Sequence, residues 1–216
     1  MNEVVDPRQA ELLAAASELS LALATGTAER LLCYLDLLQR WNATYNLTAI
    51  RDPHDMLVQH LFDCLAVIAP LRRVLAAKGR VLDVGSGGGL PGAVIAAMCP
   101  QLDVLCVDTV GKKAAFIRQA AVELGLPNLH AEHARVEHLD APPFDLITSR
   151  AFSSLADFVR LTQRHLAPGA VWMAMKGKRP DADIAALPAN IEVFHVEQLL
   201  VPGLAAERCL VWMRFK

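Results

Sequence analysis

Glycines crowd one short segment of the chain, Asp83-Val-Gly-Ser-Gly-Gly-Gly-Leu-Pro-Gly92, which begins with an acid. A glycine-rich turn that leads into a helix brings backbone N–H groups and the helix N-terminus close to a ligand. The spacing Gly87-x-Gly89-x-x-Gly92 also satisfies the fingerprint of dinucleotide-binding proteins. The loop alone therefore predicts an adenosine-containing ligand and leaves its class open.

The acid beside the loop favours S-adenosylmethionine over a dinucleotide as the ligand. Asp83 stands two residues before Gly85, at the end of the expected strand, where it would repel a pyrophosphate across a low-dielectric gap. S-adenosylmethionine instead carries a sulfonium and an α-ammonium, which a carboxylate attracts. The spacing Asp83-x-Gly85-x-Gly87-x-Gly89 resembles the first motif of Rossmann-like methyltransferases, so S-adenosylmethionine is favoured over NAD(P) or a purely structural turn.

A second acid follows at the distance expected of a nucleoside site. Asp108 ends the apolar run 102–108, about 20 residues beyond the glycines, where an acid can bind ribose hydroxyls. The alternative is that Asp108 caps the helix beginning near Gly111, because Asp is favoured at helix starts as well.

Neither a metal site nor a disulfide framework is predicted. His130, His133 and His138 lie close in sequence, and His60 lies near Asp63, but neither group has a second ligand cluster of recognised spacing. The five cysteines are odd in number and scattered among apolar neighbours, which indicates reduced, buried thiols.

A sheet must carry these residues. From residue 80 onward, apolar runs alternate with amphipathic segments, which predicts parallel strands joined by helices. The expected strands are 80–84, 102–108, 128–132, 144–148 and 170–175, and the expected helices are 91–99, 111–125, 154–166 and 181–187. Strands 191–200 and 207–215, linked through Pro202-Gly203, should add an antiparallel hairpin and complete a seven-stranded sheet.

The N-terminal part is expected to be helical. Apolar residues recur at helical spacing after Asp6-Pro7, after Thr27 and after Asp52-Pro53, where the third helix should continue to Pro70. Asn46 can end the second helix in a left-handed conformation, or contact nucleic acid. We expect a helical extension over 1–78, packed as one compact unit on a Rossmann-like methyltransferase core over 79–216.

Composition agrees with a single large domain. The 216 residues are 54% hydrophobic, enough for a sizeable core. The N-terminus shows neither the basic nor the apolar region of a signal peptide, which indicates a cytoplasmic protein, and we expect a monomer. A net charge of −2 hides a more basic part beyond residue 70, which permits a local basic face but does not establish a nucleic-acid partner.

The segment after strand 144–148 is informative by what it lacks. Ser149-Arg-Ala-Phe152 is not the Asp/Asn-Pro-Pro-aromatic motif that suits methylation of an exocyclic amine. It contains no cysteine either, which argues against a covalent route to C5 of pyrimidines. Ring nitrogens, oxygen acceptors, small molecules and protein side chains remain as possible methyl acceptors.

A series of different short motifs is spread from Arg40 to the C-terminal part of the chain. They are Arg40-Trp-Asn42, Asn46-Leu-Thr48, His60-x-x-Asp63, Val81-x-Asp-Val-Gly-Ser-Gly-x-Gly-Leu-Pro-Gly92, Gly111-Lys-Lys113, Arg135-Val-Glu137, Ser149-Arg-Ala-Phe152 and Met175-Lys-Gly177. Together they resemble the bacterial RsmG/GidB family, which methylates N7 of a guanine in 16S ribosomal RNA. The resemblance implies this RNA as the partner, free or within the small subunit or an assembly intermediate.

The resemblance also implies a cofactor site. S-adenosylmethionine contacts are expected at Gly85, Leu90, Val136, Glu137 and Arg150, beside Asp83, Gly87 and Asp108. Because N7 of guanine offers a lone pair and bears no hydrogen, its methylation needs positioning and no general base.

The residues that hold RNA are assigned from charge and position only. Lys176, Lys178 and Arg179 are candidates for phosphate contacts, or a solvated charged turn. Phe152 is a candidate for stacking on the target base, or an ordinary core aromatic. Two other functions stay open for the loop: an NAD(P)-dependent oxidoreductase and a non-catalytic, adenosine-responsive binding module.

Overall fold

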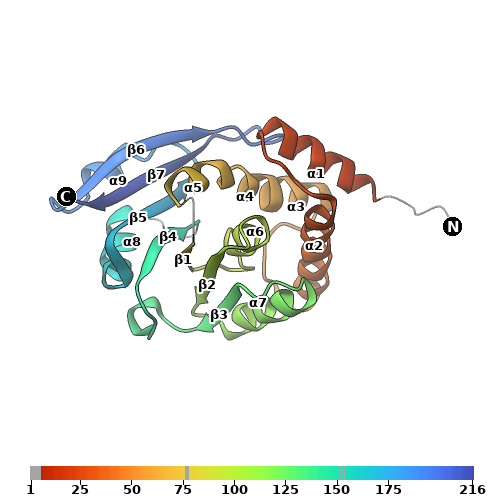
Figure 1. Cartoon of the computed structure of the whole chain (residues 1–216), viewed down its shortest axis with the longest axis horizontal. Coiled ribbons are helices and arrows are strands. Elements are labelled where there is room, and N and C mark those ends of the chain that lie inside the picture. The colour runs from red at the N-terminus through yellow and green to blue at the C-terminus, as the bar shows by residue number, and fades with distance from the viewer. Residues whose placement is uncertain (1–5, 76–77, 151, 153) are drawn as a thin grey trace.

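The structure, a computed structural model, describes residues 6–75, 78–150, 152 and 154–216. Across them, seven strands form one sheet with the order β3-β2-β1-β4-β5-β7-β6 (Figure 1). The strands are β1 (Gly79–Val84), β2 (Leu102–Asp108), β3 (Leu129–His133), β4 (Phe144–Ser149), β5 (Leu166–Lys176), β6 (Ile191–Leu199) and β7 (Arg208–Phe215). Strands β1 to β5 are parallel, and β7 runs antiparallel between β5 and β6. The predicted fold class is confirmed.

Apolar residues of the central strands alternate between two hydrophobic clusters. Val81 and Val104 belong to one cluster, and Leu82 and Leu105 belong to the other. Side chains of a strand point alternately to opposite faces, so a continuous apolar run buries both faces of the sheet. These runs therefore place the carboxyl ends of β1 and β2, with their acids, in the middle of the molecule.

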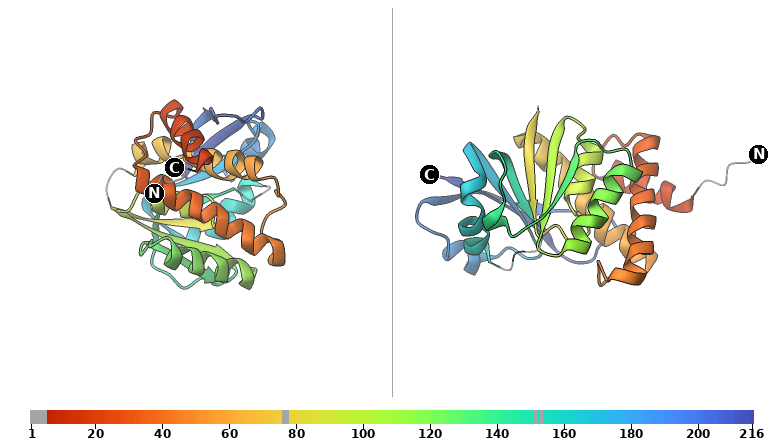
Figure 2. Two further views of the ribbon diagram at one scale, coloured as in Figure 1. Left: turned by 90° about the vertical axis from the view of Figure 1, so that its right-hand side faces the viewer. Right: turned by 90° about the horizontal axis from the view of Figure 1, so that it is seen from below.

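Helices cover the two faces of the sheet (Figures 1 and 2). Those within the core are α6 (Gly92–Met98), α7 (Gly111–Glu123), α8 (Leu155–Thr162) and α9 (Asp181–Ala185), and those of the extension are α1 (Pro7–Glu18), α2 (Thr25–Tyr45), α3 (Pro53–Met56), α4 (Asp63–Leu65) and α5 (Ile68–Val74). Every residue of α6 is buried. Since α2 and α4 both contact α6, the extension supplies the cover that its apolar sequence requires.

The third predicted helix differs from a regular one. A π-helical segment over Leu57–Phe62 lies between α3 and α4, and α5 carries the helical path beyond Pro70 to Val74. The first of these segments, α3, is capped by Asp52, whose carboxylate accepts hydrogen bonds from the N–H groups of His54 and Asp55. Short π-helical segments are frequent at functional sites, and this one carries His60.

Two further expectations are corrected and one is confirmed. β5 begins at Leu166 rather than 170, because the helix before it ends at Thr162 and a single 3-10 turn follows. Cys33 is exposed, whereas the other four cysteines are buried and all five are free. Asn46 ends α2 with φ of 50°, the left-handed conformation predicted for it.

Among the residues described here, no helix has the length and apolar character needed to cross a membrane.

Candidate active site

The loop between β1 and α6 owes its shape to its glycines. Gly85, Gly87 and Gly89 have φ angles of 66°, 59° and 88°, a region that glycine adopts without strain. The N–H of Gly85 donates to the carbonyl of Val107 over 2.9 Å, which ties the loop to the end of β2. On the other side, the hydroxyl of Tyr34 donates to the carbonyl of Gly88 over 2.6 Å. The sheet and the extension thus hold the loop between them.

Asp108 connects this loop to the start of α7. Its Oδ2 accepts a hydrogen bond from the N–H of Gly87 over 2.9 Å, and its Oδ1 accepts one from the N–H of Val110 over 2.9 Å. The ammonium of Lys113 lies 3.8 Å from Oδ2. The bond to Val110 fits the capping role, and the side chain also lines a cavity, which the ribose-binding role requires.

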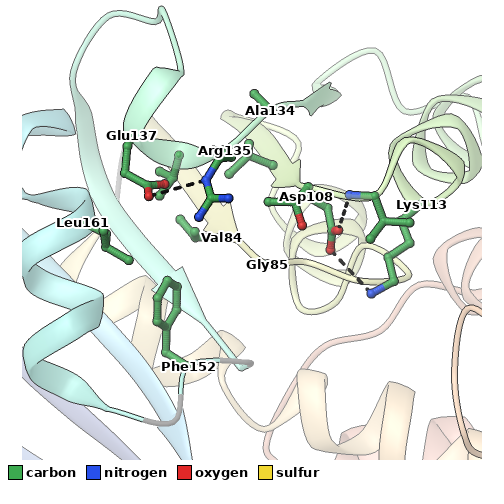
Figure 3. A pocket seen from close by; sticks show the side chains of 13 residues that line it. Val84, Gly85, Asp108, Lys113, Ala134, Arg135, Glu137, Phe152 and Leu161 are labelled. Atoms are coloured by element: carbon green, nitrogen blue, oxygen red, sulfur yellow. Dashed lines mark hydrogen bonds and ion pairs between the residues drawn. The ribbon is translucent and has the colours of Figure 1, made fainter.

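A cavity of about 340 Å³, here called the nucleoside cavity, opens beside Asp108 (Figure 3). Val136 and Glu137 line it from a 3-10 turn after β3. Gly85 lines it from the glycine loop, so the structure brings together four of the residues predicted to contact the cofactor. The carboxylate of Glu137 lies 3.7 Å from Nε of Arg135, whose side chain is largely exposed.

Phe152 lies in the nucleoside cavity and not beyond it. Its ring stands in the wall opposite Asp108 (Figure 3) and packs on the ring of Phe158, with centroids 5.2 Å apart. This position suits contact with a cofactor ring better than stacking on an RNA base. The assignment of Phe152 to the target base stays a prediction.

Two further cavities continue from the first in a row. A loop cavity of about 220 Å³ shares Gly85 and Lys113 with the nucleoside cavity and extends past Gly87 and Leu90 to Arg150. The next cavity, of about 400 Å³, shares Thr48, His60 and Arg150 with the loop cavity. We call it the Asp63 cavity, after the carboxylate in its wall.

The first two cavities match the chemistry of S-adenosylmethionine. A carboxylate stands at one end for hydroxyl groups, a guanidinium at the other for a carboxylate, and a glycine backbone lies between them. Together Asp108, the loop and Arg150 would hold the nucleoside, the sulfonium and the amino-acid part in that order. Ligand cavities are commonly about 300–1,000 Å³. The nucleoside cavity, of about 340 Å³, lies within this range, and the loop cavity, of about 220 Å³, extends that cavity.

Asp83 does not line either cavity. Its carboxylate is fully buried beneath the loop, where Oδ2 accepts a hydrogen bond from the N–H of Gly92 over 2.8 Å and lies 4.0 Å from Sγ of Cys106. Burial raises the pKa of Asp83 to about 7, against the opposing effect of the Gly92 hydrogen bond. The expected direct contact with the cofactor is therefore not supported, because the strand end turns this side chain toward α6.

Asp63 is the most enclosed charge of the third cavity. Its side chain is only 2% exposed and accepts from two guanidiniums: Oδ2 lies 3.2 Å from Nη1 of Arg150, and Oδ1 lies 2.9 Å from Nε of Arg208. The sequence singled out Arg150 but not Arg208. The structure brings Arg208 to this cavity because it starts β7, and the next residue, Cys209, pairs across the sheet with Lys176.

His60 lies beside these charges in an uncharged form. Its Nε2 is 3.0 Å from Oγ1 of Thr48, and burial, together with the charge of Arg150, lowers the pKa of His60 to about 4. A neutral imidazole adds no positive charge to the cavity near pH 7, so the guanidiniums and Lys176 dominate its electrostatics.

The three candidate phosphate ligands differ in exposure. The side chain of Lys176 is only 13% exposed, and its ammonium donates to the carbonyl of Phe152 and to Asp183 over 3.0 and 3.1 Å. Lys178 and Arg179 are exposed, and Arg179 pairs with Asp181 at 2.7 Å. Lys176 therefore serves the wall of the Asp63 cavity, and only the other two can reach a phosphate outside it.

Comparison with known proteins places this geometry in a family. The family described as "rRNA small subunit methyltransferase G", or GidB, matches residues 27–211. A protein of that name from Leptothrix cholodnii is 63% identical over 211 residues, covering 97% of both chains.

Solved structures with low sequence identity support the fold. TrmN from Thermus thermophilus superimposes with a TM-score of 0.58 at 23% identity over 74% of this chain, which spans about half (53%) of that longer chain. A Burkholderia thailandensis 1,6-didemethyltoxoflavin-N1-methyltransferase with bound S-adenosylhomocysteine also gives 0.58, at 16% identity, covering 85% of this chain and 89% of its own. The family match over residues 27–211 covers most of the sequence and includes all the motifs around the three cavities. The chain belongs to the GidB family of small-subunit rRNA methyltransferases.

Proposed function

We propose that this protein transfers a methyl group from S-adenosylmethionine to N7 of a guanine in 16S ribosomal RNA. It acts in the cytoplasm, as a monomer, on the small subunit or an assembly intermediate. The observation that carries the proposal is the row of three cavities, which leads from Asp108 past Arg150 into a chamber lined by cationic side chains. Membership of the family supports the same reaction.

Each cofactor contact has a defined task in this proposal. Asp108 accepts hydrogen bonds from the ribose hydroxyls, and Val136 and Glu137 border the adenine. Gly85, Gly87 and Leu90 lie along the sulfonium part of the cofactor, between the ribose and the amino-acid end. Arg150 binds its carboxylate. Bound in this way, S-adenosylmethionine supplies an activated methyl group on a sulfonium.

The protein's catalytic contribution is to position the acceptor. The lone pair of N7 forms the new bond to the methyl carbon while the carbon–sulfur bond breaks, and its electron pair stays on sulfur, so no proton moves. Aligning the reacting atoms at near-attack distance supplies much of the acceleration. The guanine gains a positive charge, which a buried site with fixed carboxylates can stabilise.

The pH dependence tests this mechanism. We expect the single-turnover rate to stay nearly constant between about pH 6 and 9, because no catalytic proton is titrated there. His60, with its pKa of about 4, remains neutral throughout this range. Rapid-quench measurements at saturating cofactor and subunit would give the profile.

Asp83 provides the control, because its pKa of about 7 lies within the range. If the wild type shows a step near pH 7 that the active Asp83→Asn variant lacks, the step reports the packing beneath the loop. A rise with pH that accompanies loss of activity on replacing one carboxylate or histidine would identify a base and exclude N7.

The basic turn after β5 should govern docking. Replacing Lys178 and Arg179 with glutamine should raise KM for the RNA substrate and reduce the slope of its logarithmic salt dependence by about 1.4, the amount expected for two single-strand phosphate contacts. Cofactor affinity, measured calorimetrically, should not change. An unaltered salt slope would assign both residues to the solvated surface.

The function itself is tested by methyl transfer. Purified protein should label small subunits from a strain that lacks this methylation, and mapping should locate 7-methylguanine at one nucleotide. A thermal shift with S-adenosylmethionine but not with NAD would support the cofactor assignment. Stabilisation by NAD alone, or a labelled base other than guanine, would overturn the proposal.

A further inference from the structure

Two guanidiniums reach one buried carboxylate from distant parts of the sheet. Arg150 follows β4, Arg208 begins β7, and Asp63 begins α4 in the extension. A carboxylate that is 2% exposed would be costly to bury without such partners. The pairing therefore fixes both guanidiniums at the wall of the Asp63 cavity, next to the cavity assigned to the methyl donor.

The two arginines have different donors left for a ligand. Arg150 uses Nη1 for both Asp63 and the carbonyl of Gln59, and it faces the loop cavity as well. Arg208 donates from Nε to Asp63 and from Nη1 to the carbonyl of Glu207. Within the described part of the chain, its Nη2 makes no hydrogen bond, although the side chain is 75% covered.

We propose that Arg208 recognises the acceptor base by donating from Nη2 to its exocyclic oxygen, O6 of guanine, and that Asp63 is the positioning residue that holds Arg208 there. This inference rests on the proposed function. A guanidinium is only a donor, so it pairs with O6 of guanine and meets the donor amino group of adenine unfavourably. A single bond to O6 leaves the lone pair of N7 free to attack.

The surroundings of Arg208 suit this role. Lys176, the third cation of the wall beside Arg150 and Arg208, already donates to Phe152 and Asp183, and Nε2 of His60 lies 3.0 Å from Oγ1 of Thr48. Lys176 is held by these partners, and His60 is neutral, with a buried Nδ1 that has no partner in the described part of the chain. Arg208 differs from both, because Asp63 fixes it and its charged Nη2 keeps donors available. A planar, pre-oriented guanidinium loses little freedom on forming this bond, which suits recognition inside a cavity.

The test compares Arg208→Met, which removes all donors, with Arg208→Lys, which keeps the charge. Arg214→Gln is the matched control, because Arg214 lies on the same strand and pairs with Glu192 at 2.8 Å. Each is assayed on unmethylated small subunits with guanine at the mapped nucleotide, and the wild type is also assayed on subunits with adenine there. We expect Arg208→Met to lower kcat by about 10- to 100-fold with cofactor affinity and salt slope unchanged, and Arg208→Lys to recover part of the loss.

Asp63→Asn tests the positioning role, since the amide keeps the shape but not the charge. At saturating cofactor it should lower kcat as Arg208→Met does, and the double variant should lose little more kcat, because both changes remove the same interaction. Since Asp63 also pairs with Arg150, Asp63→Asn should weaken cofactor binding as well, which Arg208→Met should not. A raised KM with a flatter salt slope would make Arg208 a phosphate ligand, and unchanged kcat would remove it from the site. Equal wild-type rates on subunits with guanine and with adenine at this nucleotide would overturn the proposal that Arg208 recognises O6. A wild type inactive on every subunit would instead refute the proposed function.

Discussion

Replacing Gly92 with alanine is expected to lower the free energy of unfolding by about 2 kcal/mol, within the range measured for overpacked cores. Gly92 is the first residue of α6 and is buried against β1 and β2. A Cβ atom there would overlap Sγ of Cys106 and lie 3.0 Å from Oδ2 of Asp83. Both neighbours are fully buried, so relieving the overlap requires the packed interior to shift, and the better helix propensity of alanine does not compensate. Chemical denaturation followed by circular dichroism would measure the loss.

Two variants separate steric overlap from other effects at Gly92. Gly26→Ala is the matched control, because Gly26 lies in the first turn of α2 and has no heavy atom within 4 Å of the added Cβ, so its stability should be unchanged or slightly higher. Cys106→Ala should rescue Gly92→Ala in part by removing the overlapping sulfur. If Gly92→Ala is as stable as the wild type, α6 can shift from the sheet and the packing argument is wrong.

Asp108→Ala is expected to weaken S-adenosylmethionine binding by about 1–3 kcal/mol, the range for loss of a charged hydrogen-bond acceptor. The change removes acceptors for the ribose and also frees the N–H groups of Gly87 and Val110. Isothermal titration with S-adenosylhomocysteine would measure it without turnover. Both causes lower affinity, so they reinforce each other.

The capping role of Asp108 is distinguished by stability and by a control on the same strand. Asp103→Ala removes an acid of β2 that is 45% exposed and pairs with Arg80, and cofactor affinity should not respond. A lower melting temperature of Asp108→Ala with unchanged affinity would make Asp108 a helix cap only. Asp108→Asn keeps one acceptor for Val110, so it should retain stability better than alanine does.

The sheet was predictable because burial on both faces leaves a continuous apolar run in each central strand. Val81, Leu82 and their neighbours in β2 are of this kind, and the acids that end the runs were located correctly. Asp83 lies two residues after Val81 and so faces the same side of the sheet, which α6 covers; the sequence alone did not show that this side is closed to the ligand. The change to π-helical geometry at Leu57 leaves no mark in apolar spacing either.

Contacts between distant segments were beyond prediction from one sequence. Asp63 and Arg208 are 145 positions apart, and their meeting depends on β7 lying beside β5 instead of at the sheet edge. Lys176 was assigned to RNA because its charge suggested exposure, but its ammonium is held by Phe152 and Asp183. The charge of these residues made them candidates for RNA contacts, but only the folded structure shows which cations are bound by protein groups and which are exposed.

The two ends of the cavity row come from different parts of the chain, which bears on how such enzymes diverge. All residues around the nucleoside cavity lie between Val84 and Leu161, whereas the Asp63 cavity takes most of its wall from segments 48–63, 175–177 and Arg208. Mutations in those outer segments can therefore change the methyl acceptor without touching the nucleoside cavity, provided that Thr48, His60 and Asp63, which also border or hold the donor site, are kept. A library confined to them is the economical starting point for engineering a transferase with a new acceptor.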